Sequence, residues 1–214
     1  MEVKGLKKMN FSQWILFSLF VFIYGFITPF NRSFGQENEA PVADIHLPDQ
    51  WDKIHDLKDY RNEVLIILYG DQKGMPENKD LGEKLFLHYH PTAKGLSPAK
   101  ARKEKVIEVS RLPQGKKSPE VRVIPVAAIG KVPQLVKNII IRRVKKEAPE
   151  TDVWLDFENQ MKEKFGMRTA QPNLIVVDAE GKLRLKIMGK LDDKIYKQLI
   201  ETVDNLRNEA LGIR

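Results

Sequence analysis

Two histidines separated by a single tyrosine, His88 and His90, have the spacing in this sequence that most suggests a metal site. Their imidazoles would share one face of a strand, but on a helix they would diverge by about 200°. The preceding residues follow a helical pattern, and His46 and His55 lie far away in sequence. We therefore expect surface histidines near a helix end and no metal or cofactor, with metal-assisted chemistry as the alternative.

The other reactive side chains give weaker signals. The sequence has no cysteine, so thiol catalysis and disulfide bonds are both excluded. No serine stands in a glycine elbow, and no glycine-rich loop carries the lysine and hydroxyl that cradle a phosphate. Asp71, Glu77 and Asp178 are candidates for a carboxylate pair, but carboxylates at strand ends and in first helical turns are ordinarily caps or solvated groups.

The elements that would position these residues begin with a buried strand. Residues 64–69 are continuously apolar and of strand length, and a glycine ends the run. Such a strand is covered on both faces and belongs in the centre of a sheet. A loop over 70–76 then leads to a first helix over 78–90, with Asn78 or Asp80 as its cap.

The middle of the chain is less regular. Residues 91–119 contain repeated prolines and glycines, which predict an insertion with at most a short strand over 106–109. A second buried strand is expected over 121–129, although Pro125 fits a central ladder only at a kink near the strand end. A second helix is expected over 133–147. Its apolar residues follow core spacing: Leu135, Val136, Ile139, Ile140 and Val144.

The C-terminal part has the clearest pattern. Two apolar runs, 173–178 and 183–188, flank an Ala-Glu-Gly-Lys turn, which predicts a β-hairpin. A short helix over 157–165, ended by a glycine, precedes it. Asp192 or Asp193 is expected to cap a final helix with one apolar stripe. The predicted order is therefore strand, helix, strand, helix, hairpin, helix.

This order of elements is similar to the thioredoxin fold, and the C-terminal part resembles redoxin-type members. Gln171 and Pro172 stand directly before the hairpin, where the family places a cis-proline beside its active loop. The run LIVVDAEGK over 174–182 resembles the family's strand, acidic-glycine turn and return strand, and residues 154–157 and 164–167 resemble the stretch just upstream. The resemblance implies an α/β fold, a three-layer α/β/α sandwich around a mixed four- to five-stranded sheet.

The chain departs from this family at the active loop. In redox-active members a nucleophilic cysteine stands just beyond the first central strand, where the next helix stabilises its thiolate. Here the loop has no cysteine, which excludes disulfide exchange and peroxide reduction by the family's mechanism. We therefore expect a vestigial active-site face that binds through helix-start amides and a proline-held strand end. Its residues are Gly70, Asp71, Gln72, Lys73, Gly74, Met75, Pro76, Gln171 and Pro172.

The N-terminus carries an export or anchoring pattern. Three lysines precede an uncharged apolar run over 11–30, which just suffices as a helix to cross a hydrocarbon core of about 30 Å. Residues 1–35 are therefore expected to be a signal peptide or a membrane anchor, and Ser33 and Gly35 suit cleavage before Gln36. The positive leader favours an extracytoplasmic domain, periplasmic or secreted, or one anchored in the cytoplasmic membrane.

Residues 36–49 are expected to form a linker, and residues 50–209 a thioredoxin-like domain that includes the insertion over 91–119. The insertion is basic: from Lys94 to Arg122, nine side chains are basic and three are acidic. Such a strip suits a solvated loop, or contact with anionic lipid or another acidic surface. No aromatic side chain lies among these lysines to stack on bases, so nucleic acid is not an expected partner.

Together these patterns predict a cysteine-less binding or assembly module of the cell envelope. Its expected partner is an envelope protein or an extended peptide, with the N-terminal segment contacting the membrane. Neither thiol-disulfide exchange nor peroxidase activity is expected. The alternative is an enzyme with non-thiol chemistry, assisted by a metal at His88 and His90.

Overall fold

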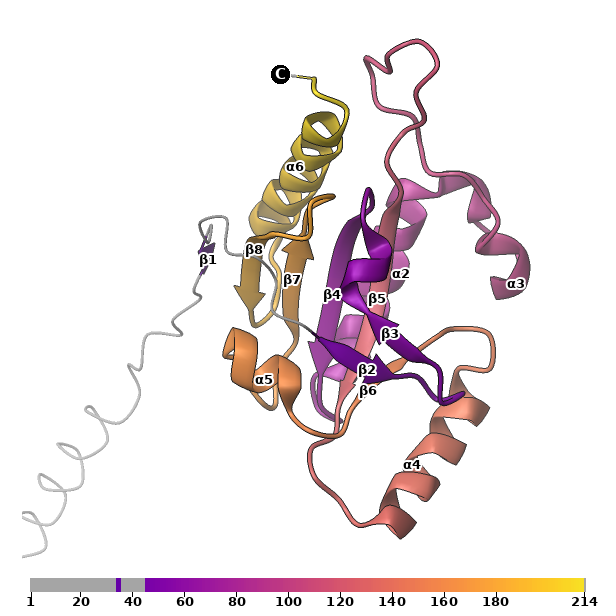
Figure 1. The fold of residues 1–214 in the computed structure, drawn as a ribbon, viewed down its shortest axis with the longest axis vertical. Helices are drawn as coiled ribbons and strands as arrows, with labels where there is room; N and C mark the ends of the chain where they lie inside the picture. The colour runs from indigo at the N-terminus through magenta and orange to yellow at the C-terminus, as the bar shows by residue number, and fades with distance from the viewer. Residues whose placement is uncertain (1–33, 36–44, 214) are drawn as a thin grey trace, which may run out of the picture. The chain divides into compact units, whose positions relative to one another are not determined.

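A buried apolar strand, β4 (Val64–Gly70), lies in the middle of a mixed β-sheet, as the sequence predicts (Figure 1). The structure is a computed structural model that describes residues 34–35 and 45–213. The other strands of this sheet are β1 (Phe34–Gly35), β5 (Val121–Ala128), β6 (Trp154–Asp156), β7 (Asn173–Val177) and β8 (Leu183–Met188). They follow the order β1-β8-β7-β4-β5-β6. β4 is parallel to β5 and antiparallel to β7.

Helices and a separate hairpin cover the two faces of the sheet (Figure 1). The helices are α2 (Met75–Tyr89), α3 (Pro98–Ala101), α4 (Gln134–Glu147), α5 (Gln160–Phe165) and α6 (Asp193–Ala210), with 3-10 turns η1 (Leu57–Tyr60) and η2 (Pro91–Ala93). The hairpin consists of β2 (His46–Pro48) and β3 (Ile54–Asp56). Even-numbered residues of β4 face α2 and α6, and odd-numbered ones face the hairpin, η1 and α5. The expected three-layer α/β/α fold is confirmed, with the hairpin sharing the second face.

Pro125 occupies the middle of β5 rather than a kink at its end. The Val64 N–H donates to the Glu120 carbonyl oxygen (2.9 Å), so even-numbered peptide groups of β5 face β4 and odd-numbered ones face away. The missing N–H of Pro125 therefore lies on the side away from β4, where β6 begins to pair only at Val126. The strand tolerates the proline because no ladder bond to β4 is lost.

Local signals determine the start of α6 but not that of α2. Asp192 caps α6 by accepting a backbone N–H (2.9 Å), as predicted. α2 begins at Met75 instead of residue 78, and its N-cap, Gly74, makes no side-chain capping bond. Pro76 permits this earlier start, because proline fits the first turn of a helix. Asn78 is therefore not a cap but a buried side chain, 3% exposed.

α4 forms where it was predicted, but its apolar residues do not enter the core. None of its residues, all of which the structure describes, is buried. Leu135, Val136 and Ile139 are 71%, 38% and 51% exposed, so the expectation that they join the core is wrong. Ile141 and Val144 contact a small apolar cluster that includes β6 and hold the helix at that edge of the sheet.

Residues 45–49 belong to the folded domain, so the expected linker over 36–49 is wrong at this end. Ile45 and Leu47 are buried, and β2 pairs with β3. Residues 106–109 are irregular, so the insertion does not contain the short strand for which the sequence left room. Within the part of the chain that the structure describes, no helix is long and apolar enough to cross a membrane. The predicted apolar segment over 11–30 lies outside the described residues.

Candidate functional site

The loop between β4 and α2 lies directly against the loop before β7. A Cβ on Gly74 would lie 2.5 Å from the Gln171 carbonyl oxygen, so glycine is what lets the two loops meet. A Cβ on Gly70 would lie 2.7 Å from the side-chain nitrogen of Asn78. The structure therefore brings together both segments of the vestigial face that was expected from the sequence.

Asp71 ties these two loops together. Its Oδ1 accepts hydrogen bonds from the N–H groups of Lys73 (3.0 Å) and Gly74 (3.1 Å), and its Oδ2 accepts one from Ala170 (2.7 Å). Partial burial alone would raise the pKa of Asp71, but these amides and the charge of Lys73 outweigh it and lower the pKa. Asp71 is therefore charged at neutral pH, and it occupies two of the amides that we expected to be open donors.

Asn173 supports the second loop from inside the domain. Its side chain is buried, and its Nδ2 lies close to the carbonyl oxygens of Arg168 (2.8 Å), Gln171 (3.0 Å) and Tyr69 (3.2 Å). Its Oδ1 accepts the Arg168 N–H (2.9 Å). Because one carboxamide joins the loop to the end of β4, the position of the loop is set by the sheet.

Pro172 differs from the sequence-based expectations in its peptide bond and in the burial of its side chain. The resemblance implies a cis-proline, but no peptide bond among the described residues is cis. The Pro172 side chain is also buried. The exposed members of the vestigial face are Gln72, Lys73 and Pro76, and the half-buried members are Asp71, Met75 and Gln171. A partner would therefore meet the loop after β4 more than the proline.

A shallow groove of about 250 Å³ lies beside the vestigial face. It is lined by Glu77, Asp80, Leu81, Pro172, Lys190 and Leu191. Lys190 Nζ lies 2.5 Å from Glu77 Oε1, so an ion pair forms part of the rim. The lining residues after β8 were missed from the sequence, because only the pairing of β8 with β7 brings them next to α2. The groove combines apolar walls with both signs of charge.

Two amide side chains at this site have unused hydrogen-bonding groups. Both polar atoms of Asn78 and the Nε2 of Gln171 are buried and have no partner among the described residues. Buried amides are ordinarily paired, because an unpaired group costs about 1–3 kcal/mol. The Asn78 amide lies beside Gly70, whereas Gln171 meets Gly74 through its backbone carbonyl oxygen.

Solved structures of low sequence identity share this architecture. No family model and no curated protein sequence matches the chain. A candidate DsbE, a thiol:disulfide interchange protein from Chlorobium tepidum, has a TM-score of 0.50 at 13% identity, over 79% of this chain and 99% of that one. A secreted thiol-disulfide isomerase from Corynebacterium glutamicum has a TM-score of 0.54 at 14% identity, over 86% of this chain and 96% of that one. This chain has the thioredoxin-like fold.

The other candidate groups of this thioredoxin-like chain do not assemble into a site. His90 is 3% exposed with its Nε2 2.7 Å from Glu120 Oε1, so it is not the surface histidine that we expected, whereas His88 is exposed. Among the described residues, no three His, Asp or Glu side chains are placed to hold a metal. Asp71 follows β4 and Asp178 follows the antiparallel β7, so these carboxylates lie at opposite ends of the sheet.

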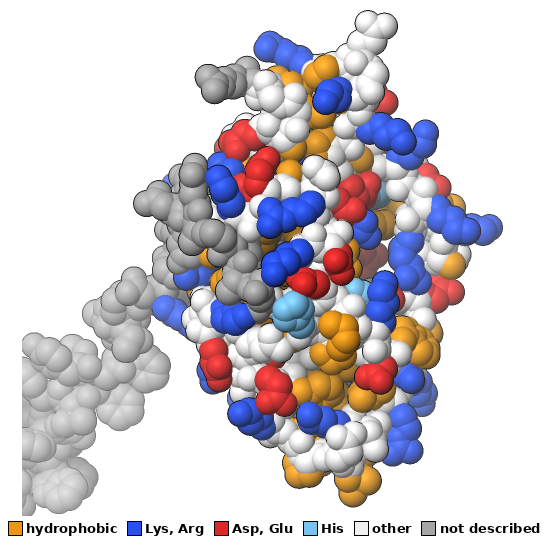
Figure 2. Space-filling model, in the orientation of Figure 1, with side chains coloured by type: hydrophobic (Ala, Val, Ile, Leu, Met, Phe, Trp, Pro, Cys, Tyr) orange, Lys and Arg blue, Asp and Glu red, His pale blue; other side chains and the backbone are white. Residues whose placement is uncertain are grey.

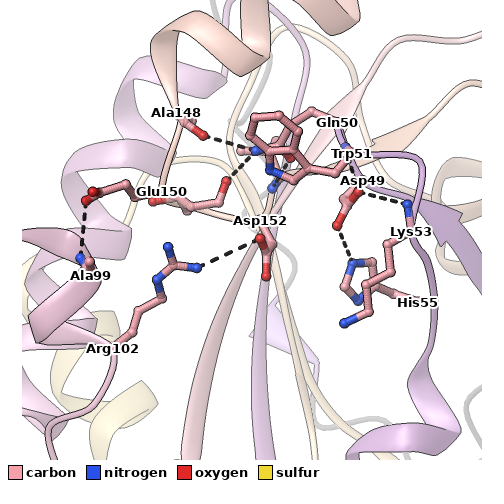
Figure 3. Close-up of polar contacts among 12 residues, drawn as sticks. Asp49, Gln50, Trp51, Lys53, His55, Ala99, Arg102, Ala148, Glu150 and Asp152 are labelled. Carbon is pink, nitrogen blue, oxygen red and sulfur yellow. Dashed lines mark hydrogen bonds and ion pairs between the residues drawn. The ribbon is translucent and has the colours of Figure 1, made fainter.

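A chain of three polar side chains, two of them buried, was missed from the sequence and links the β2–β3 hairpin to η1. His55 Nε2 lies 2.9 Å from Asp49 Oδ2, and His55 Nδ1 lies 2.9 Å from the Tyr60 hydroxyl. Figure 3 shows the Asp49–His55 contact, and the Trp154 ring stacks on the imidazole at 4.9 Å. Asp49 and His55 are 2% and 3% exposed, so a substrate cannot reach them and their role is structural.

Proposed function

We propose that this thioredoxin-like chain is a non-catalytic binding or assembly module on the outer side of a membrane. In this proposal the vestigial face and the adjoining groove hold an extended peptide segment of an envelope protein. The reaction of redox-active relatives requires a thiolate, and the sequence has no cysteine to supply one. Binding is therefore the activity that the face can retain.

The observation that carries this proposal is the groove beside Pro172. Its volume, about 250 Å³, suits a side chain or two of a peptide rather than a large ligand. Leu81 and Leu191 offer apolar contact, and the Glu77–Lys190 pair offers charge of both signs. An extended peptide needs this combination of side-chain pocket and polar contacts.

Two observations support the location. The positive leader and the uncharged apolar run over 11–30 are typical of a chain that is exported or anchored. The Corynebacterium glutamicum protein of the same fold is described as secreted. A domain on the outer side of the membrane would meet envelope proteins rather than cytoplasmic ones.

Site-specific photo-crosslinking in intact cells tests the binding face. A photoreactive residue is placed in the full chain at Lys73 on the loop, at Lys190 on the groove rim, or at Lys162 on α5 as a control. Lys73 and Lys162 are both exposed. α5, which carries Lys162, covers the face of the sheet opposite to the one that α2 and the groove occupy. We expect the same discrete adduct from positions 73 and 190 and none of it from 162.

Charge reversal provides the second arm of this experiment. Lys190→Glu places like charge beside Glu77 and is expected to reduce the adduct from position 73, whereas Lys162→Glu leaves it unchanged. An adduct that is equally strong from all three positions, or absent from 73 and 190, contradicts the proposed face. Reductase or peroxidase turnover by the pure chain would contradict its non-catalytic nature.

A further inference from the structure

α4 presents an apolar side that no other part of the described chain covers. Leu135 and Ile139 are one turn apart and Val136 is adjacent, so the three lie on one side of the helix. They are among the most exposed large apolar side chains of the described residues. Ile141 and Val144 attach the helix by its other side to the cluster beside β6. The helix is thus held at the edge of the sheet with its apolar side outward.

Basic residues continue the same side of α4 toward its C-terminus. Arg142 and Lys146 follow Leu135 and Ile139 at spacings of three and four residues, and Arg143 lies next to them. From Gln134 to Glu147 five side chains are basic and only Glu147 is acidic. We define the α4 face as Leu135, Val136, Ile139, Arg142, Arg143 and Lys146. Its first half is apolar and its second half is cationic.

The turn of the β2–β3 hairpin extends this surface. Trp51 is 49% exposed, and Lys145 Nζ lies 4.9 Å from the centre of its ring. The neighbouring Gln50 donates through Nε2 to the carbonyl oxygens of Ala148 (3.0 Å) and Thr151 (2.6 Å), which fixes the turn beside the end of α4 (Figure 3). Figure 2 shows hydrophobic side chains at the surface of this end of the domain, with Lys and Arg side chains around them.

We propose that the α4 face docks the domain on an anionic lipid bilayer. An apolar side flanked by arginine and lysine is the pattern of a helix that lies in the membrane interface, where apolar side chains enter the headgroup boundary and cations meet phosphates. Tryptophan, as at position 51, prefers the same interface. With five basic side chains and one acidic one, α4 complements an anionic surface, and this one-sided charge favours lipid over a protein partner of mixed charge.

The experiment uses the absence of cysteine in the chain. Asn138→Cys places a unique thiol beside Leu135 and Ile139 without removing either, and an environment-sensitive fluorophore is attached to it in the full chain. Glu201→Cys, exposed on α6, is the matched control. With vesicles of phosphatidylcholine plus phosphatidylglycerol we expect a blue shift and quenching by lipid-borne quenchers at position 138 only. Vesicles of phosphatidylcholine alone are expected to give little shift. High salt is expected to reverse the shift that the anionic vesicles cause.

Two charge-reversal variants identify the surface responsible. Arg142→Glu, Arg143→Glu and Lys146→Glu together are expected to raise the lipid concentration that gives half of the fluorescence shift by at least about ten-fold. The control reverses three exposed lysines of the insertion, Lys105, Lys116 and Lys117, and is expected to retain it. The proposal is overturned if position 138 responds equally to neutral vesicles, or if the insertion variant loses the signal instead. A shift without vesicles that grows with protein concentration would also overturn it, because a second copy would then cover α4.

Discussion

Asp71 holds together the loop at which redox-active proteins of the thioredoxin fold carry a thiol. It accepts three backbone N–H groups from two separate loops, two of them at the entry to α2. Amides at a helix start are the groups that stabilise a thiolate or a bound anion. In this chain the Asp71 carboxylate accepts hydrogen bonds from these amides, so an anion of the protein itself occupies the position of a thiolate or a bound anion.

Removal of this carboxylate is expected to loosen both loops. We predict that Asp71→Ala lowers the free energy of unfolding by about 1–3 kcal/mol at neutral pH, because three amides lose their acceptor. Urea denaturation measures the change. Asp59→Ala, at an exposed aspartate of η1, is the control and should change stability by less than about 0.5 kcal/mol.

The same variant has a predicted pH dependence. The pKa of Asp71 is lowered in the folded state, so its contribution is present above the unfolded pKa of about 3.9 and is lost as the pH falls through the lower folded value. The stability difference between the native chain and Asp71→Ala should therefore shrink below about pH 4. A difference that stays constant or grows in acid would contradict this assignment.

At the scale of elements, a helix or strand could be predicted from the sequence where its hydrophobic pattern was long. β4, β7, β8 and α6 carry long local patterns and lie where they were predicted. β2, β3 and β6 have three residues each, which is too short for a periodicity. Tertiary pairing creates them, as in the bridge between Asp49 and Trp154. For α4, apolar spacing predicted the helix but not what its apolar side contacts.

The candidate site divides in the same way. The two segments of the vestigial face could be located because family resemblance places a loop after the first strand and a proline before the hairpin. The groove could not, because Lys190 and Leu191 reach α2 only through the pairing of β8 with β7. The burial of Asn78 depends equally on the earlier start of α2 at Met75.

Arg207 connects α6 to the insertion and provides a test of how firmly that segment is held. Arg207 is 1% exposed, and its guanidinium donates to the carbonyl oxygens of Pro119 (3.2 Å) and Ile107. We predict that Arg207→Met costs at least about 2 kcal/mol of stability, because the buried Pro119 carbonyl and the partly buried Ile107 carbonyl lose their donor. Denaturation and limited proteolysis measure the stability and the release of residues 107–119.

The control for this variant is Arg143→Met, which removes an exposed ion pair with Glu147 within α4. It should cost less than about 0.5 kcal/mol and leave the protease pattern unchanged. An insertion that resists protease equally in both variants would show that Arg207 does not hold it.

At the scale of the whole molecule, stability is concentrated in the sheet and in the layers on its two faces. α2 and α6 bury residues against the sheet. The structure describes every residue of α4, and none of them is buried. We predict that without lipid the amides of 134–147 exchange with deuterium well before those of 75–89, because local opening of α4 exposes little apolar surface. Mass spectrometry resolves the two segments. Equal protection of α2 and α4 would contradict this distribution.

Pro125 has a consequence for how copies of the molecule behave when they are crowded together. Upstream of Val126 no strand of the described chain continues β6 along the outer side of β5. An open strand margin is a template for intermolecular pairing and aggregation. The proline removes the donor that an incoming strand would need at that point, so we expect it to act as a gatekeeper against self-association.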